Sequence, residues 1–226
     1  MDTEKRILLY GDSNTYGTLP LWKASPYIYN RYDKDDRWTE ILAGKLGDGY
    51  KILEDGQPGR TTIYNDGTEP FARYCNGIDH LANSLMTNLP LDLVVIMLGT
   101  NDLHCLTPPT EETLGIGIER LIDEVRSFPE CGYGNVAPPI LVVAPPHFKK
   151  PKGRLEVFPK FHGEDGIRLS KLFGPVYKEV AKRKGCYFLD SSEYTEPHEA
   201  DGVHFTKESH RRFADAIYES IKGIIG

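Results

Sequence analysis

The feature that most constrains the fold is an alternation, along the whole chain, of short apolar runs with segments of helical spacing. Five runs predict buried strands, at residues 6–10, 50–53, 93–98, 140–144 and 187–189. The third and fourth of these runs are unbroken and aliphatic, which is typical of strands that are covered on both faces.

Between the runs, apolar residues recur at helical spacing and indicate four helix faces. The faces are formed by Trp38, Ile41, Leu42 and Leu46; by Ile78, Leu81, Leu85 and Leu89; by Leu114, Ile118, Leu121, Ile122 and Val125; and by Phe213, Ile217, Ile221 and Ile224. Residues 170–184 predict another helix, closed by Gly185. Strands that alternate with helices predict right-handed crossovers and a three-layer α/β/α fold around a parallel sheet.

The 226 residues suit one α/β domain, which we expect to span residues 1–226. The formal net charge of −6 argues against nucleic acid or an anionic membrane as the main partner. The four cysteines form no CxxC pair, and the chain starts without the pattern of a signal peptide. We therefore expect reduced thiols in a cytoplasmic protein.

Two segments depart from the alternation, at residues 18–37 and 145–166. The first is rich in aromatic residues, and the second is rich in Pro, Lys and Phe. Both are long for connections in a compact domain, so each is interpreted either as a loop that shapes a pocket or as a surface excursion without a role. The aromatic side chains of Tyr16, Trp22 and Tyr27 are candidates for a substrate pocket.

Chemically versatile residues follow the expected strands, at the sheet edge where ligands bind in such folds. These segments are residues 11–15 (GDSNT), 54–60 (EDGQPGR) and 99–102 (GTND), followed after the last strand by 201–204 (DGVH). Each segment is a weak signal alone, and Ser13 by itself would suit a helix N-cap. Together they predict a nucleophile, backbone donors, an amide and an Asp/His pair at one edge.

A serine nucleophile needs a base, and histidine has the ordinary pKa best suited to that task. We interpret His204 as the base for Ser13 and Asp201 as the carboxylate that orients the base. In a competing interpretation Asp201 caps the last helix, for which Thr206 is the better candidate.

Acyl transfer creates a negative oxygen that needs fixed hydrogen-bond donors. Candidates are the backbone N–H groups of Ser13 and Gly59 and the side-chain amide of Asn101. Asp12 and Asp102 are candidates for supporting roles, since Asp102 is placed to orient Asn101 or to bond the loop backbone.

Other kinds of site fit less well. Asp201, His204 and His198 match no common zinc spacing, so we expect no metal. A flavin- or phosphate-binding module on the same sheet would need a phosphate loop, and no GxxxxGK[ST] motif occurs. We therefore expect no cofactor. A protein with an inactive triad and a deacetylase acting on sugars are the remaining alternatives.

The four segments resemble, in order, the motif blocks of the SGNH (GDSL-like) hydrolases, and the resemblance spans nearly the whole chain. It implies a flavodoxin-like five-stranded sheet of order 2-1-3-4-5. It also implies a serine esterase with Ser13 as nucleophile, His204 as base and Asp201 as its partner. In that family, residues at the positions of Gly59 and Asn101 complete the oxyanion hole.

Some segments look closest to the bacterial arylesterase/acyltransferase branch, namely residues 37–39 (RWT), 60–62 (RTT), 89–93 (LPLDL) and 95–102. Members of that branch cleave short acyl and aryl esters, and some pass the acyl group to alcohols or peroxide. Some form homo-oligomers through long loops, a role that residues 145–166 could serve here. The resemblance thus implies a small-molecule ester substrate.

The chain also departs from the family pattern. Asn14 stands where the family usually has Leu, and Glu54 and Pro58 replace an Asn and a Ser of the second block. Gly59 is retained, so the backbone donor is expected to be retained as well.

Overall fold

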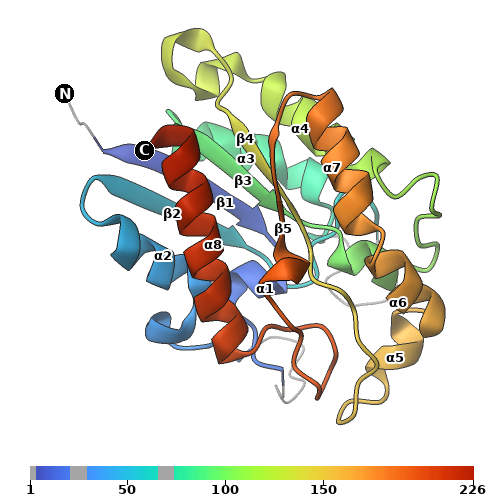
Figure 1. Ribbon diagram of the computed structural model, residues 1–226. Coiled ribbons are helices and arrows are strands. Elements are labelled where there is room, and N and C mark those ends of the chain that lie inside the picture. Colours follow the sequence, from blue (N-terminus) through green and yellow to red (C-terminus); the bar gives the residue numbers. More distant parts are fainter. Residues whose placement is uncertain (1–3, 21–29, 66–73) are drawn as a thin grey trace.

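A computed structural model describes residues 4–20, 30–65 and 74–226 and contains one parallel sheet in the order β2-β1-β3-β4-β5 (Figure 1). The strands are β1 (Lys5–Gly11), β2 (Tyr50–Gly56), β3 (Leu93–Met97), β4 (Ile140–Ala144) and β5 (Tyr187–Asp190). The expected fold class and the strand order 2-1-3-4-5 are confirmed. All five predicted strands exist, and β2 is longer than predicted.

Helices cover both faces of the sheet. They are α1 (Ser13–Tyr16), α2 (Trp38–Leu46), α3 (Gly77–Asn88), α4 (Ile116–Arg126), α5 (Val157–Lys160), α6 (Glu164–Ser170), α7 (Phe173–Arg183) and α8 (Lys207–Ile225). Short 3-10 turns are η1 (Lys34–Asp36), η3 (Thr100–His104), η4 (Pro129–Cys131), η5 (Tyr133–Asn135) and η6 (Ser191–Glu193). Among these described helices, none is long and apolar enough to cross a membrane.

The two hydrophobic cores follow from the alternation of side chains along each strand. Along β1, Leu8 and Tyr10 pack with helices α3, α4 and α7, whereas Ile7 and Leu9 pack with α2 and α8. The strand β3 divides its residues between the same two cores and is buried throughout. Both faces of the sheet are therefore buried under helices, which explains why the central strands are unbroken apolar runs.

The predicted helices form, with differences at their ends. α3 ends at Asn88, so Leu89 lies outside the predicted helix face and is exposed, because Pro90 disfavours a helical residue before it. Leu114 precedes α4 and is nevertheless buried. The helix predicted at residues 170–184 is α7, and Gly185 follows it with a positive φ of 59°.

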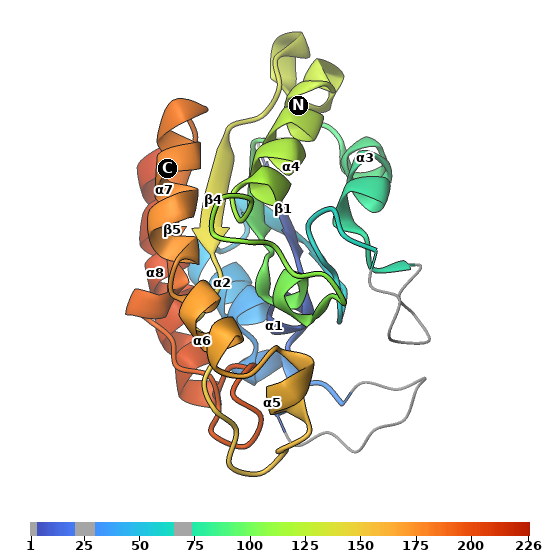
Figure 2. The same cartoon turned by 90° about the vertical axis from the view of Figure 1, so that its right-hand side faces the viewer.

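The excursion predicted at residues 145–166 is not a plain loop, because it contains α5 and the start of α6. Figure 2 shows both helices at the same end of the molecule as α1. Phe148 anchors this segment, with its ring stacked 4.9 Å from that of Phe161 and 6.3 Å from that of Phe158. In the segment at residues 18–37, the structure describes residues 18–20 and 30–37. Thr18 and Arg31 form an antiparallel bridge there.

Candidate active site

Ser13 is the first residue of α1, directly beyond the carboxyl end of β1. Asp12 caps the helix, since its Oδ1 accepts a hydrogen bond of 2.9 Å from the Asn14 N–H. The turn requires Gly11, because a Cβ there would lie 2.0 Å from Thr15 Oγ1. Ser13 itself is therefore not the N-cap, and its hydroxyl is free to face the loop that follows β5.

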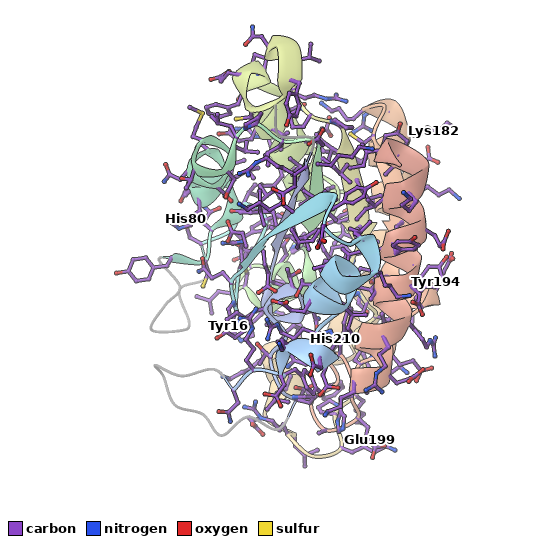
Figure 3. The ribbon with its side chains drawn as sticks, turned by 90° about the vertical axis from the view of Figure 1, so that its left-hand side faces the viewer. Tyr16, His80, Lys182, Tyr194, Glu199 and His210 are labelled. Carbon is purple, nitrogen blue, oxygen red and sulfur yellow. The ribbon has the colours of Figure 1, made fainter. Side chains whose placement is uncertain are left out.

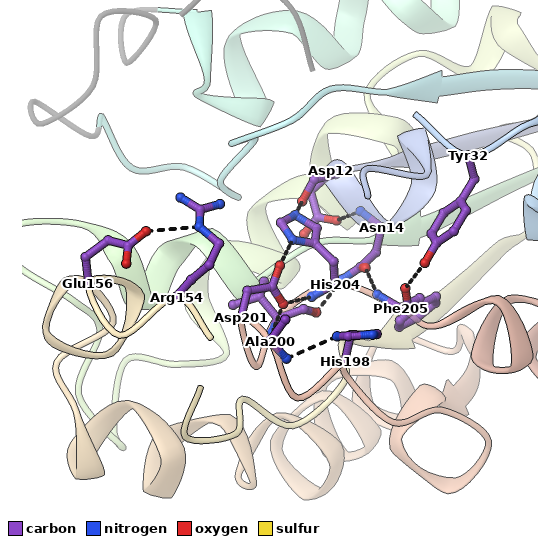
Figure 4. Close-up of polar contacts among 12 residues, drawn as sticks. Asp12, Asn14, Tyr32, Arg154, Glu156, His198, Ala200, Asp201, His204 and Phe205 are labelled. Atoms are coloured by element: carbon purple, nitrogen blue, oxygen red, sulfur yellow. Dashed lines mark hydrogen bonds and ion pairs between the residues drawn. The ribbon is translucent and has the colours of Figure 1, made fainter. Parts of the chain in front are cut away.

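A continuous set of hydrogen bonds joins the serine to the Asp/His pair. Figure 4 shows the pair, His204 and Asp201, beside Asp12 and Asn14. Ser13 Oγ lies 3.0 Å from His204 Nε2, and His204 Nδ1 lies 2.6 Å from Asp201 Oδ2. The other carboxylate oxygen of Asp201 accepts from the backbone N–H groups of Val203 at 2.9 Å and His204 at 3.1 Å. The spacing of three residues thus forms a tight turn around one buried carboxylate.

The electrostatics of Asp201 suit a residue that stays ionised. Burial alone would raise the pKa of Asp201, but the hydrogen bond and charge of His204, with the two backbone donors, hold it below its ordinary value. Gly202 makes the turn possible with a φ of 73°, and a Cβ there would lie 1.8 Å from Lys149 O.

Asn14 holds the histidine loop against α1. Its Nδ2 donates to Val203 O at 3.2 Å, and its Oδ1 accepts from Phe205 N–H at 2.9 Å, so it binds the backbone on both sides of His204. Its own carbonyl accepts from Trp38 Nε1 at 3.1 Å. Asn14 is fully buried, and the sequence showed it only as a departure from the family pattern.

The three candidate oxyanion donors come from three neighbouring strand ends. Gly59 lies in the turn after β2 with a φ of 83°, and Gln57 N–H bonds Gly11 O at 3.0 Å, which holds this turn beside β1. Asn101 lies in η3, after β3. The hydrogen bonds of the described residues leave the backbone N–H groups of Ser13 and Gly59 without an acceptor.

Asp102 bonds the loop backbone rather than Asn101. Its two oxygens accept from the Thr62 N–H at 2.7 Å and the Thr62 hydroxyl at 2.6 Å. Burial raises the pKa of Asp102 to about 7 and that of Asp12 to about 6. Asp12 Oδ2 also lies 3.5 Å from Asn101 Nδ2, the limit of a hydrogen bond.

Of the three aromatic pocket candidates, Trp22 and Tyr27 lie outside the described residues, and Tyr16 ends α1 (Figure 3). The Arg31 guanidinium lies 4.3 Å above the Tyr16 ring. Arg31 in turn pairs with Glu54, which also accepts from the Thr39 hydroxyl. Glu54, which replaces the family's Asn in the second motif block, thus connects that block to Arg31 in the segment at residues 18–37.

His198 was considered above as a possible metal ligand, but its side chain binds the backbone of the loop before α8. Its Nδ1 accepts from Ala200 N–H at 3.0 Å. Within the described parts of the chain, no group of three His, Cys, Asp or Glu side chains is arranged to hold a metal ion. Thr206, not Asp201, caps α8 by accepting from Ser209 N–H at 2.9 Å.

A flavodoxin-like sheet that carries a hydrogen-bonded Ser, His and Asp at its strand ends defines a class, the SGNH-type ester hydrolases. The sequence model of the GDSL-like lipase/acylhydrolase family matches residues 9–212. The chain therefore belongs to this family of carboxylic ester hydrolases.

Two solved structures with clear similarity to this chain are named as esterases. The aryl esterase of M. smegmatis is 33% identical, with a TM-score of 0.86, over 98% of this chain and 100% of that one. A carbohydrate acetylesterase from Sinorhizobium meliloti is 33% identical, with a TM-score of 0.87 and the same coverage. A comparison with curated proteins gives no match.

Proposed function

We propose that the protein is a serine esterase that cleaves short-chain acyl or aryl esters through Ser13, His204 and Asp201. The observation that carries this proposal is the unbroken hydrogen-bonded line from Ser13 Oγ through both ring nitrogens of His204 to Asp201 Oδ2. In this arrangement the base is within reach of the hydroxyl proton and its tautomer is fixed by a buried carboxylate.

In the proposed mechanism, Ser13 Oγ attacks the ester carbonyl carbon while His204 Nε2 takes the hydroxyl proton. The tetrahedral oxyanion is held by the N–H groups of Ser13 and Gly59 and by the Asn101 amide. Collapse breaks the bond to the alcohol, which leaves with the proton from His204. Water then attacks the acyl-enzyme with His204 again as base, and the acid and free Ser13 are released.

Acyl transfer follows from the same scheme. If an alcohol reaches the acyl-enzyme in place of water, His204 takes the alcohol's proton and a new ester forms. His204 would activate water and an alcohol in the same way. The ratio of acyl transfer to hydrolysis therefore depends on how well the pocket excludes water. The resemblance to the arylesterase/acyltransferase branch supports testing this second activity.

A second substrate class has support of its own. The sequence identity to the Sinorhizobium meliloti carbohydrate acetylesterase, 33%, equals that to the M. smegmatis aryl esterase. Both acetylated sugars and aryl esters would present an ester carbonyl to the same triad. The two substrate classes differ in the alcohol portion, so a comparison at fixed acyl length separates them.

The experiment compares p-nitrophenyl acetate, butyrate and octanoate with acetylated xylose and glucose, using the wild type and Ser13→Ala. We expect wild-type turnover that is highest for the short acyl chains and that is lost in a folded Ser13→Ala protein. Preference for the sugar acetates would assign the protein to the carbohydrate class with the same triad. Equal turnover by both proteins would overturn the proposal.

A further inference from the structure

Arg60 is a buried arginine at the junction of the three strand ends that carry the candidate oxyanion donors. It follows Gly59 directly and is 3% exposed. One terminal nitrogen of its guanidinium donates to Gly11 O at 3.0 Å and to Asp55 O at 2.6 Å. The other donates to Asp55 Oδ1 at 2.8 Å and to Gln57 Oε1 at 3.3 Å.

The burial of a guanidinium is unfavourable unless its donors are satisfied. Here four hydrogen bonds of the two terminal nitrogens, one of them to the Asp55 carboxylate, offset the cost, and only Nε of this side chain has no hydrogen-bond partner among the described residues. The Tyr10 ring adds a further contact, with the guanidinium carbon 4.1 Å from its centre. Asp55 is held from its other side by the Ser84 hydroxyl at 2.5 Å. The planar side chain is therefore fixed in one orientation.

Each contact of Arg60 reaches a segment that presents an oxyanion donor. Gly11 stands two residues before Ser13, and Gln57 stands two residues before Gly59. The backbone carbonyl of Arg60 accepts a hydrogen bond of 3.1 Å from Asn101 Nδ2. One residue thus contacts the ends of β1 and β2 and the amide that follows β3.

We propose that Arg60 is the positioning residue of the oxyanion hole. Its side chain ties the Gly11 carbonyl to the Asp55–Gln57 turn, and this anchoring holds in place its backbone carbonyl, which binds the Asn101 amide. The inference rests on the proposed function, because an oxyanion hole has a purpose only in acyl transfer. Arg60 touches no reacting atom in this scheme. Its effect is to keep the donors in place before the oxyanion forms.

The inference predicts a specific kinetic pattern. A group that positions transition-state donors affects kcat, whereas binding of the ground-state ester is little changed. Because loss of one oxyanion donor typically costs about 10²–10³ in kcat, we expect a loss of this size for Arg60→Met. We expect Arg60→Lys to recover part of it, because an ammonium cannot span two carbonyls, a carboxylate and an amide at once.

A matched control exists at the opposite end of the sheet. Arg6 in β1 also ties carbonyl groups together, donating to Pro90 O at 3.1 Å and to Asn88 O at 3.0 Å. Arg6→Met removes the same kind of side chain and hydrogen bonds far from Ser13. It should lower the melting temperature and leave kcat within about twofold of wild type.

The experiment measures kcat and KM for p-nitrophenyl acetate, inhibition by phenylboronic acid as a tetrahedral mimic, and the melting temperature of wild type, Arg60→Met, Arg60→Lys and Arg6→Met. We expect kcat and boronate affinity to fall together in the Arg60 variants, with KM within about threefold of wild type. If Arg60→Met does not fold, Arg60→Lys carries the test, with at least a tenfold loss of kcat expected.

Two failures can be told apart. If the wild type is active and the folded Arg60 variants keep its kcat and boronate affinity, the inference is overturned and Arg60 is a structural core arginine. If the wild type neither turns over esters nor binds the boronate, the proposed function fails, and the inference falls with it.

Discussion

Asn101 carries the clearest prediction at the scale of single residues. Its Nδ2 donates to Arg60 O at 3.1 Å, and its contact with Asp12 Oδ2, at 3.5 Å, is weak enough to yield to an incoming oxyanion. Asn101→Ala should therefore lower kcat for p-nitrophenyl acetate by about 10²–10³ with little change in KM. Unchanged turnover in steady-state assays would remove Asn101 from the oxyanion hole.

The buried carboxylates Asp12 and Asp102 predict how stability depends on pH. Burial raises their pKa values to about 6 and about 7, above the ordinary value of 3.8. Between about pH 4 and 7 the folded chain therefore binds more protons than the unfolded chain, so the contribution of these groups to stability falls as the pH rises.

Asp102→Asn tests this dependence, since an amide can accept from the Thr62 N–H and donate to the Thr62 hydroxyl without titrating. The melting temperature of the variant relative to wild type should rise as the pH is raised from 5 to 8. A difference in melting temperature that is constant across this range, measured by circular dichroism, would show that Asp102 does not change protonation there.

The meeting of Ser13, Asp201 and His204 at one sheet edge could be predicted from the sequence, because their chemistry and their place after predicted strands agree. The contacts of Arg60 could not be predicted, because no sequence pattern shows which carbonyl groups a buried arginine meets. The sequence marked Asn14 only as a residue that differs from the family pattern. The structure shows that Asn14 binds the backbone on both sides of His204.

At the scale of elements, the junction between α1 and the loop before α8 predicts the effect of removing Asn14. Asn14→Leu keeps the size but leaves Val203 O and Phe205 N–H unpaired in the interior, which should cost about 1–3 kcal/mol of unfolding free energy. The accompanying shift of His204 should lower kcat by up to about 10²-fold. Urea denaturation and esterase assays check the two effects. Lost stability with full turnover would make this junction purely structural.

The strands and long helices could be predicted because burial imposes a period on their sequences. β3 and β4 lie between two cores, so every residue in them is buried and apolar. α5 and α6 could not be predicted, because helices of four and seven residues are too short to show a helical period in the sequence. Their position depends on the contacts of Phe148 with Phe158 and Phe161, which the sequence pattern does not reveal.

At the scale of the whole molecule, the fold is held without disulfides. None of the four cysteines, all of which lie in the described residues, forms a disulfide. Cys75, Cys105 and Cys131 are buried, and Cys186 is half-buried. Burial raises the pKa of the Cys186 thiol, which makes even this group slow to react. Titration with a thiol reagent should detect at most one slow thiol in the native protein and four after unfolding. Two thiols after unfolding would indicate a disulfide.

The alternation of strands and helices was sufficient to predict the α/β/α architecture, and the family resemblance supplied the strand order. This architecture brings segments that are 191 residues apart in the sequence, around Ser13 and His204, within hydrogen-bonding distance. The substrate could not be predicted to the same degree, because it depends on loops whose sequences follow no period.

The central claim is that Ser13 is the nucleophile, and covalent labelling tests it most directly. Wild type, Ser13→Ala and His204→Ala are treated with an alkyl fluorophosphonate, and the intact mass and the labelled peptide are determined. The account predicts one adduct per wild-type chain, located on Ser13, none on Ser13→Ala, and much slower labelling of His204→Ala. An adduct on another residue, or ester turnover that persists in folded Ser13→Ala, would contradict it.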